Sequence, residues 1–156
     1  MPAEIRFQPM TSASAEVLGT AFAAIDPWVH YGYTAEALST FLLSSEDGAR
    51  HFEIIVDDEI AGAICIRKNW LRGPYLQFLG VVPGMQKRGA GSAALVWFEA
   101  QARKDRARNI WVVATEFNVG ALTFYERFGF VRIATLDGLV SDGTAEILLR
   151  KRLINN

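Results

Sequence analysis

Residues 81–92 read Val81-Val82-Pro83-Gly84-Met85-Gln86-Lys87-Arg88-Gly89-Ala90-Gly91-Ser92. The apolar run before this segment is typical of a buried strand, and the residues after it repeat apolar side chains at helical spacing. Pro83 and Gly84 end the strand, because proline donates no backbone hydrogen bond and glycine permits a tight turn. The segment is therefore predicted to join a strand to the N-terminus of a helix.

A loop that leads into a helix can bind phosphate groups. The first amides of a helix have no partner within it and lie at the positive end of its dipole. Gly89 and Gly91 have no Cβ, so a pyrophosphate could approach their backbone closely. Lys87 and Arg88 add positive charge at the rim. The candidate anion-binding residues are Gln86, Lys87, Arg88, Gly89, Ala90, Gly91 and Ser92.

Taken alone, these residues leave three other interpretations of the loop open. Gly84 and Gly89 have the spacing of a P-loop, but Ala90 and Gly91 stand where a P-loop has Lys and Ser or Thr. Residues 89–94 fit a dinucleotide-binding glycine pattern, although six residues separate them from the strand. In the third interpretation the glycines are purely structural and only ease the turn.

The rest of the chain predicts a single α/β domain over residues 1–156. Strands are expected at 4–9, 51–56, 60–67, 75–82, 110–115, 130–136 and 145–151, and helices at about 12–25, after Thr34, at about 89–104 and at 118–128. A three-residue acidic turn, 57–59, separates the second and third strands. The order βααβββαβαββ predicts a mixed, mostly antiparallel sheet with helices on both faces.

Composition and charge exclude several functional classes. Sixteen Lys and Arg residues balance seventeen Asp and Glu residues, so a formal charge of -1 attracts neither nucleic acid nor an anionic membrane. The single cysteine, Cys65, excludes an internal disulfide and a cysteine-based metal site, and its apolar surroundings predict a buried thiol. No metal is expected. Without a signal peptide or a membrane-spanning apolar stretch, the protein is expected to be cytoplasmic.

Two motifs in this order resemble those of the GNAT superfamily of acetyl-coenzyme A dependent N-acetyltransferases. The first, Gln86-x-x-Gly89-x-Gly91 preceded by Val81-x-Pro83, is similar to the superfamily's pyrophosphate motif. The second, Asn118-x-x-Ala121-x-x-Phe124-Tyr125-Glu126-x-x-Gly129-Phe130, is similar to another motif of the same proteins. The predicted order of elements also matches, so the resemblance covers nearly the whole chain.

The resemblance implies a binding site for acetyl-coenzyme A (acetyl-CoA). The backbone of Val81 and Val82 would pair with the pantetheine arm, as an added strand would. The loop 86–92 would wrap the pyrophosphate. The parallel strands 75–82 and 110–115 would diverge, and the opening between them would admit the thioester.

The second motif implies cofactor contacts and a catalytic group. Asn118 would hydrogen-bond the pantetheine region while also capping its helix. Ala121 and Phe124 would line the path of the arm, although Phe124 fits a core position equally well. Tyr125 would protonate the departing thiolate as a general acid. The structural alternative is a tyrosine packed with its hydroxyl at the surface.

The sequence leaves the proton acceptor for the attacking amine open. An amine must be neutral to attack a carbonyl. Many members of the superfamily place a carboxylate on the strand before the glycine loop, but this strand has no Asp or Glu. Glu116, Asp26 and His30 are candidates for the base. The alternative is a water molecule ordered by Tyr75 and Gln77.

An aromatic segment joins the first two expected helices, a region that commonly covers the acceptor in this superfamily. Trp28, Tyr31 and Tyr33 would form a wall for the acceptor side chain. Asp26 and His30 would contact its amine. In the structural alternative, the segment only ends the helix and Trp28 fills the core beneath it.

The resulting hypothesis is an N-acetyltransferase that transfers the acetyl group of acetyl-CoA to a primary amine by direct attack in a ternary complex. No cysteine is suitably placed for an acyl-enzyme. Two other hypotheses stay open: a non-catalytic CoA-binding or sensing module, and an unrelated nucleotide-binding protein. The acceptor, a small-molecule amine or a protein N-terminus, cannot be read from the sequence. A homodimer is compatible with the resemblance.

Overall fold

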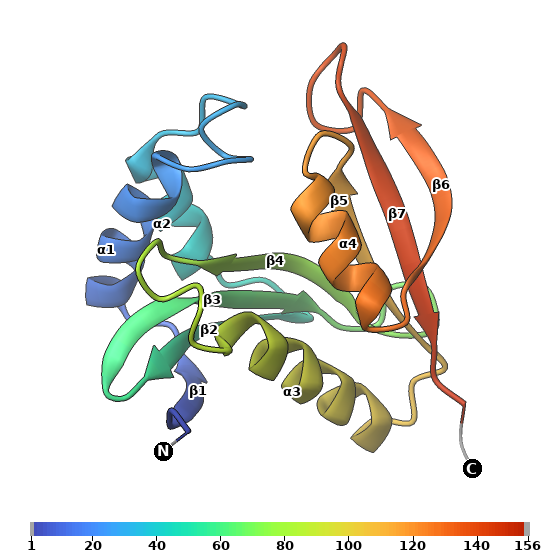
Figure 1. Ribbon diagram of the computed structural model, residues 1–156, viewed down its shortest axis with the longest axis horizontal. Helices are drawn as coiled ribbons and strands as arrows, with labels where there is room; N and C mark the ends of the chain where they lie inside the picture. The colour runs from blue at the N-terminus through green and yellow to red at the C-terminus, as the bar shows by residue number, and fades with distance from the viewer. Residues whose placement is uncertain (1, 155–156) are drawn as a thin grey trace.

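The structure is a computed structural model that describes residues 2–154 (Figure 1). Its elements follow in the order predicted from the sequence. They are β1 (Ile5–Pro9), α1 (Ser12–Ala23), α2 (Ala35–Leu43), β2 (Ala49–Val56), β3 (Glu59–Arg67), β4 (Tyr75–Val81), α3 (Ala90–Lys104), β5 (Asn109–Thr115), α4 (Val119–Arg127), β6 (Val131–Asp137) and β7 (Ala145–Arg152). Within the described residues, none of the helices combines the length and the apolar character needed to cross a membrane.

The strands form one sheet in the order β1-β2-β3-β4-β5-β7-β6. Neighbouring strands are antiparallel except β4 and β5, which are parallel. This parallel pair arises because α3 connects the end of one strand to the start of the next, and parallel strands require such a long crossover. The predicted mixed, mostly antiparallel α/β fold is confirmed.

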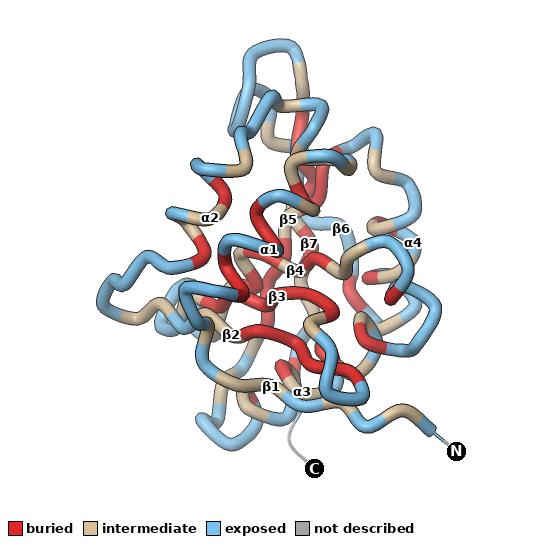
Figure 2. Tube along the Cα trace, turned by 90° about the vertical axis from the view of Figure 1, so that its left-hand side faces the viewer, coloured by how far each residue is buried: buried red, intermediate tan, exposed pale blue. Residues whose placement is uncertain are grey.

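Helices cover both faces of the sheet, and the alternation of side chains along β3 determines which helices each residue meets. Ala63 and Cys65 pack under α1 and α2, whereas Ile64 and Ile66 pack under α3 and α4. Figure 1 shows α1 beside α2, and Figure 2 shows the buried β2 and β3 at the centre of the molecule. Cys65 is fully buried, as predicted, and burial raises the pKa of its thiol.

Side-chain caps begin three of the helices. Thr11, Thr34 and Asn118 each accept a hydrogen bond from the backbone amide three residues ahead, at 3.2, 3.0 and 3.2 Å. Each bond satisfies an amide that the first helical turn leaves without a partner. Gly129 follows α4 with a φ of +96°, the left-handed conformation that ends a helix.

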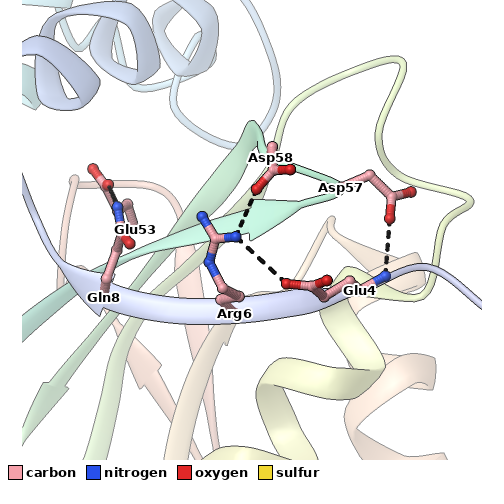
Figure 3. Close-up of polar contacts among 6 residues, drawn as sticks. All are labelled: Glu4, Arg6, Gln8, Glu53, Asp57 and Asp58. Carbon is pink, nitrogen blue, oxygen red and sulfur yellow. Dashed lines mark hydrogen bonds and ion pairs between the residues drawn. The ribbon is translucent and has the colours of Figure 1, made fainter.

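The turn between β2 and β3 is shorter than the sequence predicted. Strand β3 already begins at Glu59, so Asp57 and Asp58 alone form the turn, with φ values of 47° and 67°. Two-residue hairpin turns of this kind need positive φ at both positions, which aspartate tolerates better than most residues. Asp57 also accepts a 3.0 Å bond from the amide of Glu4, and Asp58 pairs with Arg6 at 2.7 Å (Figure 3).

A buried carboxylate joins β1, β2 and the start of α1. Glu53 is only 2% exposed and accepts hydrogen bonds from Gln8 and Thr11. Its contact with Gln8 is visible in Figure 3. Burial by itself raises the pKa of Glu53, but hydrogen bonds from Ser14, Gln8 and Thr11 outweigh it and hold the pKa below its usual value. Glu53 therefore stays ionised within a complete set of structural contacts.

Candidate functional site

A cleft of about 630 Å³ opens where β4 and β5 separate. The two strands pair only at Tyr75 with Trp111 and at Leu76 with Val112. By comparison, β5 and β7 pair along the whole of β5. Beyond Leu76, the edge of β4 that faces β5 therefore lies open. The predicted divergence of these parallel strands is confirmed.

The cleft brings together segments that are far apart in the chain. Its walls come from the α1–α2 loop, α2, β4, β5, the start of α4 and the start of β7. Several residues predicted to contact cofactor or acceptor line it, namely Asp26, Trp28, Tyr31, Tyr33, Tyr75, Gln77, Val81, Gln86, Asn118, Ala121 and Tyr125. Both sequence motifs and the aromatic loop thus meet at one place.

The glycine loop enters α3 with its amides unblocked. Gly89 is the N-cap residue with a φ of +82°, and no side chain among the described residues caps the helix there. A Cβ built on Gly89 would meet nothing within 4 Å, so open space adjoins the backbone. Met85 is buried and anchors the loop to the core. Free amides of this kind at a helix N-terminus can bind an anion.

The loop borders the cleft and does not form its floor. Gln86 contributes to the cleft lining, whereas the described lining does not include residues 87–92. Lys87 and Ser92 are exposed beside the start of α3, and Ala90 is buried beneath it. An anion held by this loop would therefore lie at one end of the cleft, with the open edge of β4 leading inward.

Arg88 is not a free charge at the rim, contrary to what the sequence suggested. Its guanidinium pairs with Asp57 at 2.5 Å, and Asp57 is held in turn by the backbone amide of Glu4. Figure 3 shows this Asp57–Glu4 contact. Exposed ion pairs contribute about 1 kcal/mol or less to stability. The pair links the glycine loop to the β2–β3 turn.

Only one of the two valines at the end of β4 offers its backbone to the cleft. The Val82 amide donates to the Ala61 carbonyl at 2.8 Å, and the Val82 carbonyl accepts from Met85 at 3.1 Å. Because backbone groups alternate in direction along a strand, Val81 faces the open side. Its carbonyl accepts a 3.2 Å bond from the Gln86 side chain. The predicted backbone contact of Val82 is not supported.

Tyr125 is buried in α4, and it lines the cleft. Its ring packs against Phe124 and Phe130 with centroid distances of 5.5 and 5.7 Å. Burial, with a smaller electrostatic contribution from Tyr75, raises the pKa of the Tyr125 hydroxyl. The hydroxyl is therefore protonated at neutral pH. The alternative of a hydroxyl at the protein surface is wrong.

The other members of the second motif divide between the cleft and the helix interface. Asn118 and Ala121 line the cleft, and the Asn118 side chain is engaged as the helix cap. Phe124 is not part of the described lining. Its ring lies 3.4 Å from a Cβ built on Gly91, so it packs α4 against α3. Phe124 thus has the structural role that the sequence left open.

Trp28 serves both roles that the sequence allowed. It stacks on Phe78 at 4.7 Å and meets Phe22 at 5.0 Å, so it covers the core. It also lines the cleft and lies over Gly80, where an added Cβ would come within 2.9 Å of the indole. His30 is exposed and packs on Phe117 at 4.4 Å, outside the described lining.

The structure separates the candidate groups for proton transfer. Glu116 follows β5, is exposed and is absent from the described lining of the cleft. Tyr75 and Gln77 share the face of β4 that lines the cleft, as expected. The side-chain oxygen of Gln77 accepts a 3.2 Å hydrogen bond from the guanidinium group of Arg67. Glu116 is therefore badly placed to receive a proton, whereas Tyr75 and Gln77 are well placed.

Sequence reasoning missed the charged residue Glu146 on β7, which lines the cleft. It is only 5% exposed, and it accepts hydrogen bonds from the Tyr31 hydroxyl at 2.5 Å and from Thr115 at 3.0 Å. Thr115 on β5 is its direct partner in the sheet. The available signal is a lone carboxylate in the apolar run 145–149.

Alkaline pH is expected to destabilise this protein through Tyr31. Burial, followed by the hydrogen bond to Glu146, raises the pKa of Tyr31 from 10.0 to about 12. Between these values the unfolded chain loses the Tyr31 proton while the folded chain keeps it, so stability falls as pH rises. Melting temperatures across this range should decline, less steeply for Tyr31→Phe. Parallel profiles for the two proteins would contradict this assignment.

Comparison with known proteins agrees with this architecture. A family model described as the acetyltransferase (GNAT) family matches residues 14–130. An acetyltransferase of Agrobacterium fabrum is 32% identical over 98 residues, which are 62% of this chain and 67% of that protein. The residues matched by the family model include the glycine loop.

Solved structures share the fold at low identity. The ribosomal-protein-S18-alanine N-acetyltransferase of Escherichia coli superposes with a TM-score of 0.77 at 16% identity, over 98% of this chain and 96% of that one. A structure from Bacillus anthracis, described as a streptothricin acetyltransferase in complex with acetyl coenzyme A, gives 0.62 at 22% identity, over 70% and 65%. The matched family model spans most of the chain, and the chain therefore belongs to the GNAT acetyltransferase family.

Proposed function

We propose that this protein is an acetyl-CoA dependent N-acetyltransferase that acetylates a primary amine by direct attack in a ternary complex. The observation that supports the proposal is the cleft, which is lined by the open edge of β4 and the buried Tyr125 and is bordered by the loop that leads into the uncapped start of α3. Acetyl-CoA supplies the acetyl group as a reactive thioester.

The residues at the divergence of β4 and β5 would hold the cofactor. The Val81 backbone would pair with the pantetheine arm, and the amides at the start of α3 would receive the pyrophosphate. Asn118 and Ala121 form the opposite wall. Lys87 is exposed beside the loop and adds a positive charge near the phosphates.

Direct attack is supported by the position of the only thiol. Cys65 lies in the core under α1 and α2, is fully buried and has a raised pKa, so it cannot accept an acetyl group. Tyr125 would protonate the leaving sulfur, because it lines the cleft and its hydroxyl keeps its proton at neutral pH. The role of the chain is then to align the amine with the thioester and to move protons.

A screen of amines with a free-thiol readout tests this function, with calorimetry of acetyl-CoA, ATP and NAD as the binding measurement. We expect acetyl-CoA to bind and at least one primary amine to cause thiol release. Binding of acetyl-CoA without turnover of any amine would favour a CoA-sensing module. Preferential binding of ATP or NAD would contradict the proposed cofactor.

Substitution of Gly89 by alanine is expected to weaken acetyl-CoA binding about tenfold. A non-glycine residue at a φ of +82° costs about 1–2 kcal/mol, and relief of that strain moves the amides at the start of α3. Gly143→Ala is the matched control, because Gly143 has a φ of +83° and is equally free of neighbours. Both variants should lose similar stability, but only Gly89→Ala should lose affinity. Equal affinities by calorimetry would contradict the phosphate site.

A further inference from the structure

Glu146 is a buried carboxylate at the wall of the cleft, and no cationic side chain among the described residues pairs with it. It is 5% exposed, and none of the ion pairs formed among residues 2–154 includes it. A buried charge without an oppositely charged partner is strongly unfavourable. A cation bound in the cleft would remove this cost.

The other buried carboxylate, Glu53, shows what a purely structural role looks like. Gln8, Thr11 and Ser14 surround it with hydrogen bonds, and it does not belong to the described lining of the cleft. Glu146 instead has one hydroxyl on each oxygen, Thr115 on Oε1 and Tyr31 on Oε2. A carboxylate can accept about four hydrogen bonds. Glu146 therefore keeps acceptor capacity for a ligand in the cleft.

The surroundings of Glu146 suit an ammonium group with an apolar body. The aromatic rings of Trp28, Tyr31, Phe41 and Tyr75 line the same cleft, and cations bind favourably to aromatic faces. Burial and the negative charge of Glu146 raise the pKa of Tyr75, which places that hydroxyl within the electrostatic reach of the carboxylate. The ammonium group of the ligand would thus pair with Glu146, and its apolar body would pack against the aromatic rings.

No free cation of the cleft wall competes for Glu146. Arg67 approaches from β3, but it pairs with Glu46 and donates to Gln77, and it is absent from the described lining. The charged and titratable groups that line the cleft beside Glu146 are Asp26, Tyr31, Tyr33, Tyr75 and Tyr125. None of these carries a positive charge, so this part of the cleft favours a cation over an anion.

We propose that Glu146 binds the ammonium group of the acceptor and takes its proton, so the substrate is a primary amine without a carboxylate next to it. This inference rests on the proposed N-acetyltransferase function. A carboxylate beside the ammonium would lie against Glu146 and be repelled.

The proton balance of the reaction follows from this placement. The ammonium gives one proton to Glu146, and the neutral nitrogen forms a C–N bond to the acetyl carbon as the C–S bond breaks. The sulfur takes a proton from Tyr125, which regains one from the nitrogen. Glu146 then releases its proton to solvent. The products are an acetamide, a free thiol and one proton.

A matched series of three amines tests the substrate class on the wild-type protein. Phenethylamine, phenylalaninamide and phenylalanine share the aromatic body and the primary amine, but only phenylalanine carries a carboxylate. We expect kcat/KM for phenylalanine to be at least about tenfold below the other two, because like charges close together are strongly disfavoured. Equal values for phenylalanine and its amide would overturn the proposed substrate class.

The variant Glu146→Gln tests the proton transfer. With phenethylamine near pH 7, kcat/KM should fall by about 100-fold, since a positioned base contributes about 10²–10⁴. The loss should shrink to less than about tenfold near pH 9, because the neutral amine becomes more abundant as pH approaches its pKa of about 10. The affinity for acetyl-CoA should not change. Glu16→Gln, an exposed substitution on α1, is the inert control.

Three outcomes would overturn the role of Glu146. The first is a loss in Glu146→Gln that is constant across pH, which indicates a structural role. The second is wild-type activity in that variant. The third is a loss in Glu116→Gln that matches the pH-dependent loss expected here, which would assign the base to Glu116. If Glu146→Gln does not fold, the amine series on the wild-type protein still decides.

Failure of the proposed function is distinguishable from failure of this inference. If the wild-type protein binds acetyl-CoA but releases no thiol with any amine, N-acetyl transfer is excluded. Calorimetric titration of phenethylamine onto the CoA-bound protein then tests the ammonium site directly. Binding that is at least about tenfold weaker in Glu146→Gln supports the site. No binding by the wild-type protein, or equal binding by both, overturns it.

Discussion

Replacement of Tyr125 by phenylalanine is expected to lower kcat by about 1,000-fold, within the range of about 10²–10⁴ typical of a general acid. The phenyl ring preserves the packing against Phe124 and Phe130, so the cleft keeps its shape. Only the hydroxyl that protonates the leaving sulfur is lost. Steady-state kinetics should show the fall in kcat, and calorimetry should show an unchanged affinity for acetyl-CoA.

The corresponding variant Tyr75→Phe separates the two tyrosines of the cleft. Tyr75 is the neighbour whose charge affects the pKa of Tyr125, so it is the other hydroxyl able to carry the proton. We expect a much smaller loss of kcat in Tyr75→Phe, because Tyr75 would act on the acceptor side of the site and would not protonate the leaving sulfur. An unchanged kcat in Tyr125→Phe, together with a large loss of kcat in Tyr75→Phe, would assign the role of general acid to Tyr75 instead of Tyr125.

Substitution of Gly73 by alanine is expected to lower the free energy of unfolding by about 3 kcal/mol, the upper end of the cost of overpacking. An added Cβ would lie 1.7 Å from the carbonyl oxygen of Asn109 and 2.7 Å from its carbon. Both contacts are with backbone, which cannot rotate away. These contacts lie at the start of the short pairing between β4 and β5. Relieving the clash therefore requires a shift of the two strands that border the cleft.

Gly120→Ala is the matched control, with an effect of opposite sign. A Cβ on Gly120 meets nothing within 4 Å, and the residue lies in α4, where alanine is favoured over glycine by up to about 1 kcal/mol. Thermal unfolding should show Gly73→Ala about 10 °C below the wild type and Gly120→Ala at or above it. A wild-type melting temperature in Gly73→Ala would show that the β4–β5 junction can adjust.

Much of the cofactor site was predictable because its elements are local. The caps Thr34 and Asn118 bond to amides three residues away, and the left-handed Gly89 opens α3. Such features depend on neighbouring residues and on the backbone freedom of glycine. Two motifs of this kind in the right order were enough to predict the family and the divergence of β4 and β5.

The contacts that the sequence did not reveal join residues far apart in the chain. Arg88 pairs with Asp57, so it braces the glycine loop instead of standing free at the rim. The Val82 amide is taken by Ala61 on the neighbouring strand. Each partner is set by the packing of one strand or turn against another, which periodicity alone cannot specify.

The sequence by itself determined the order of elements, the helix starts and the loop that enters α3, because these depend on short-range hydrogen bonds and on where glycine and proline stand. Only the tertiary structure placed Glu146 against Tyr31 and Thr115. The register of β7 on β5 and the fold of the α1–α2 loop bring these residues together. The local features therefore indicate a cofactor loop, whereas long-range packing places the carboxylate proposed to receive the amine.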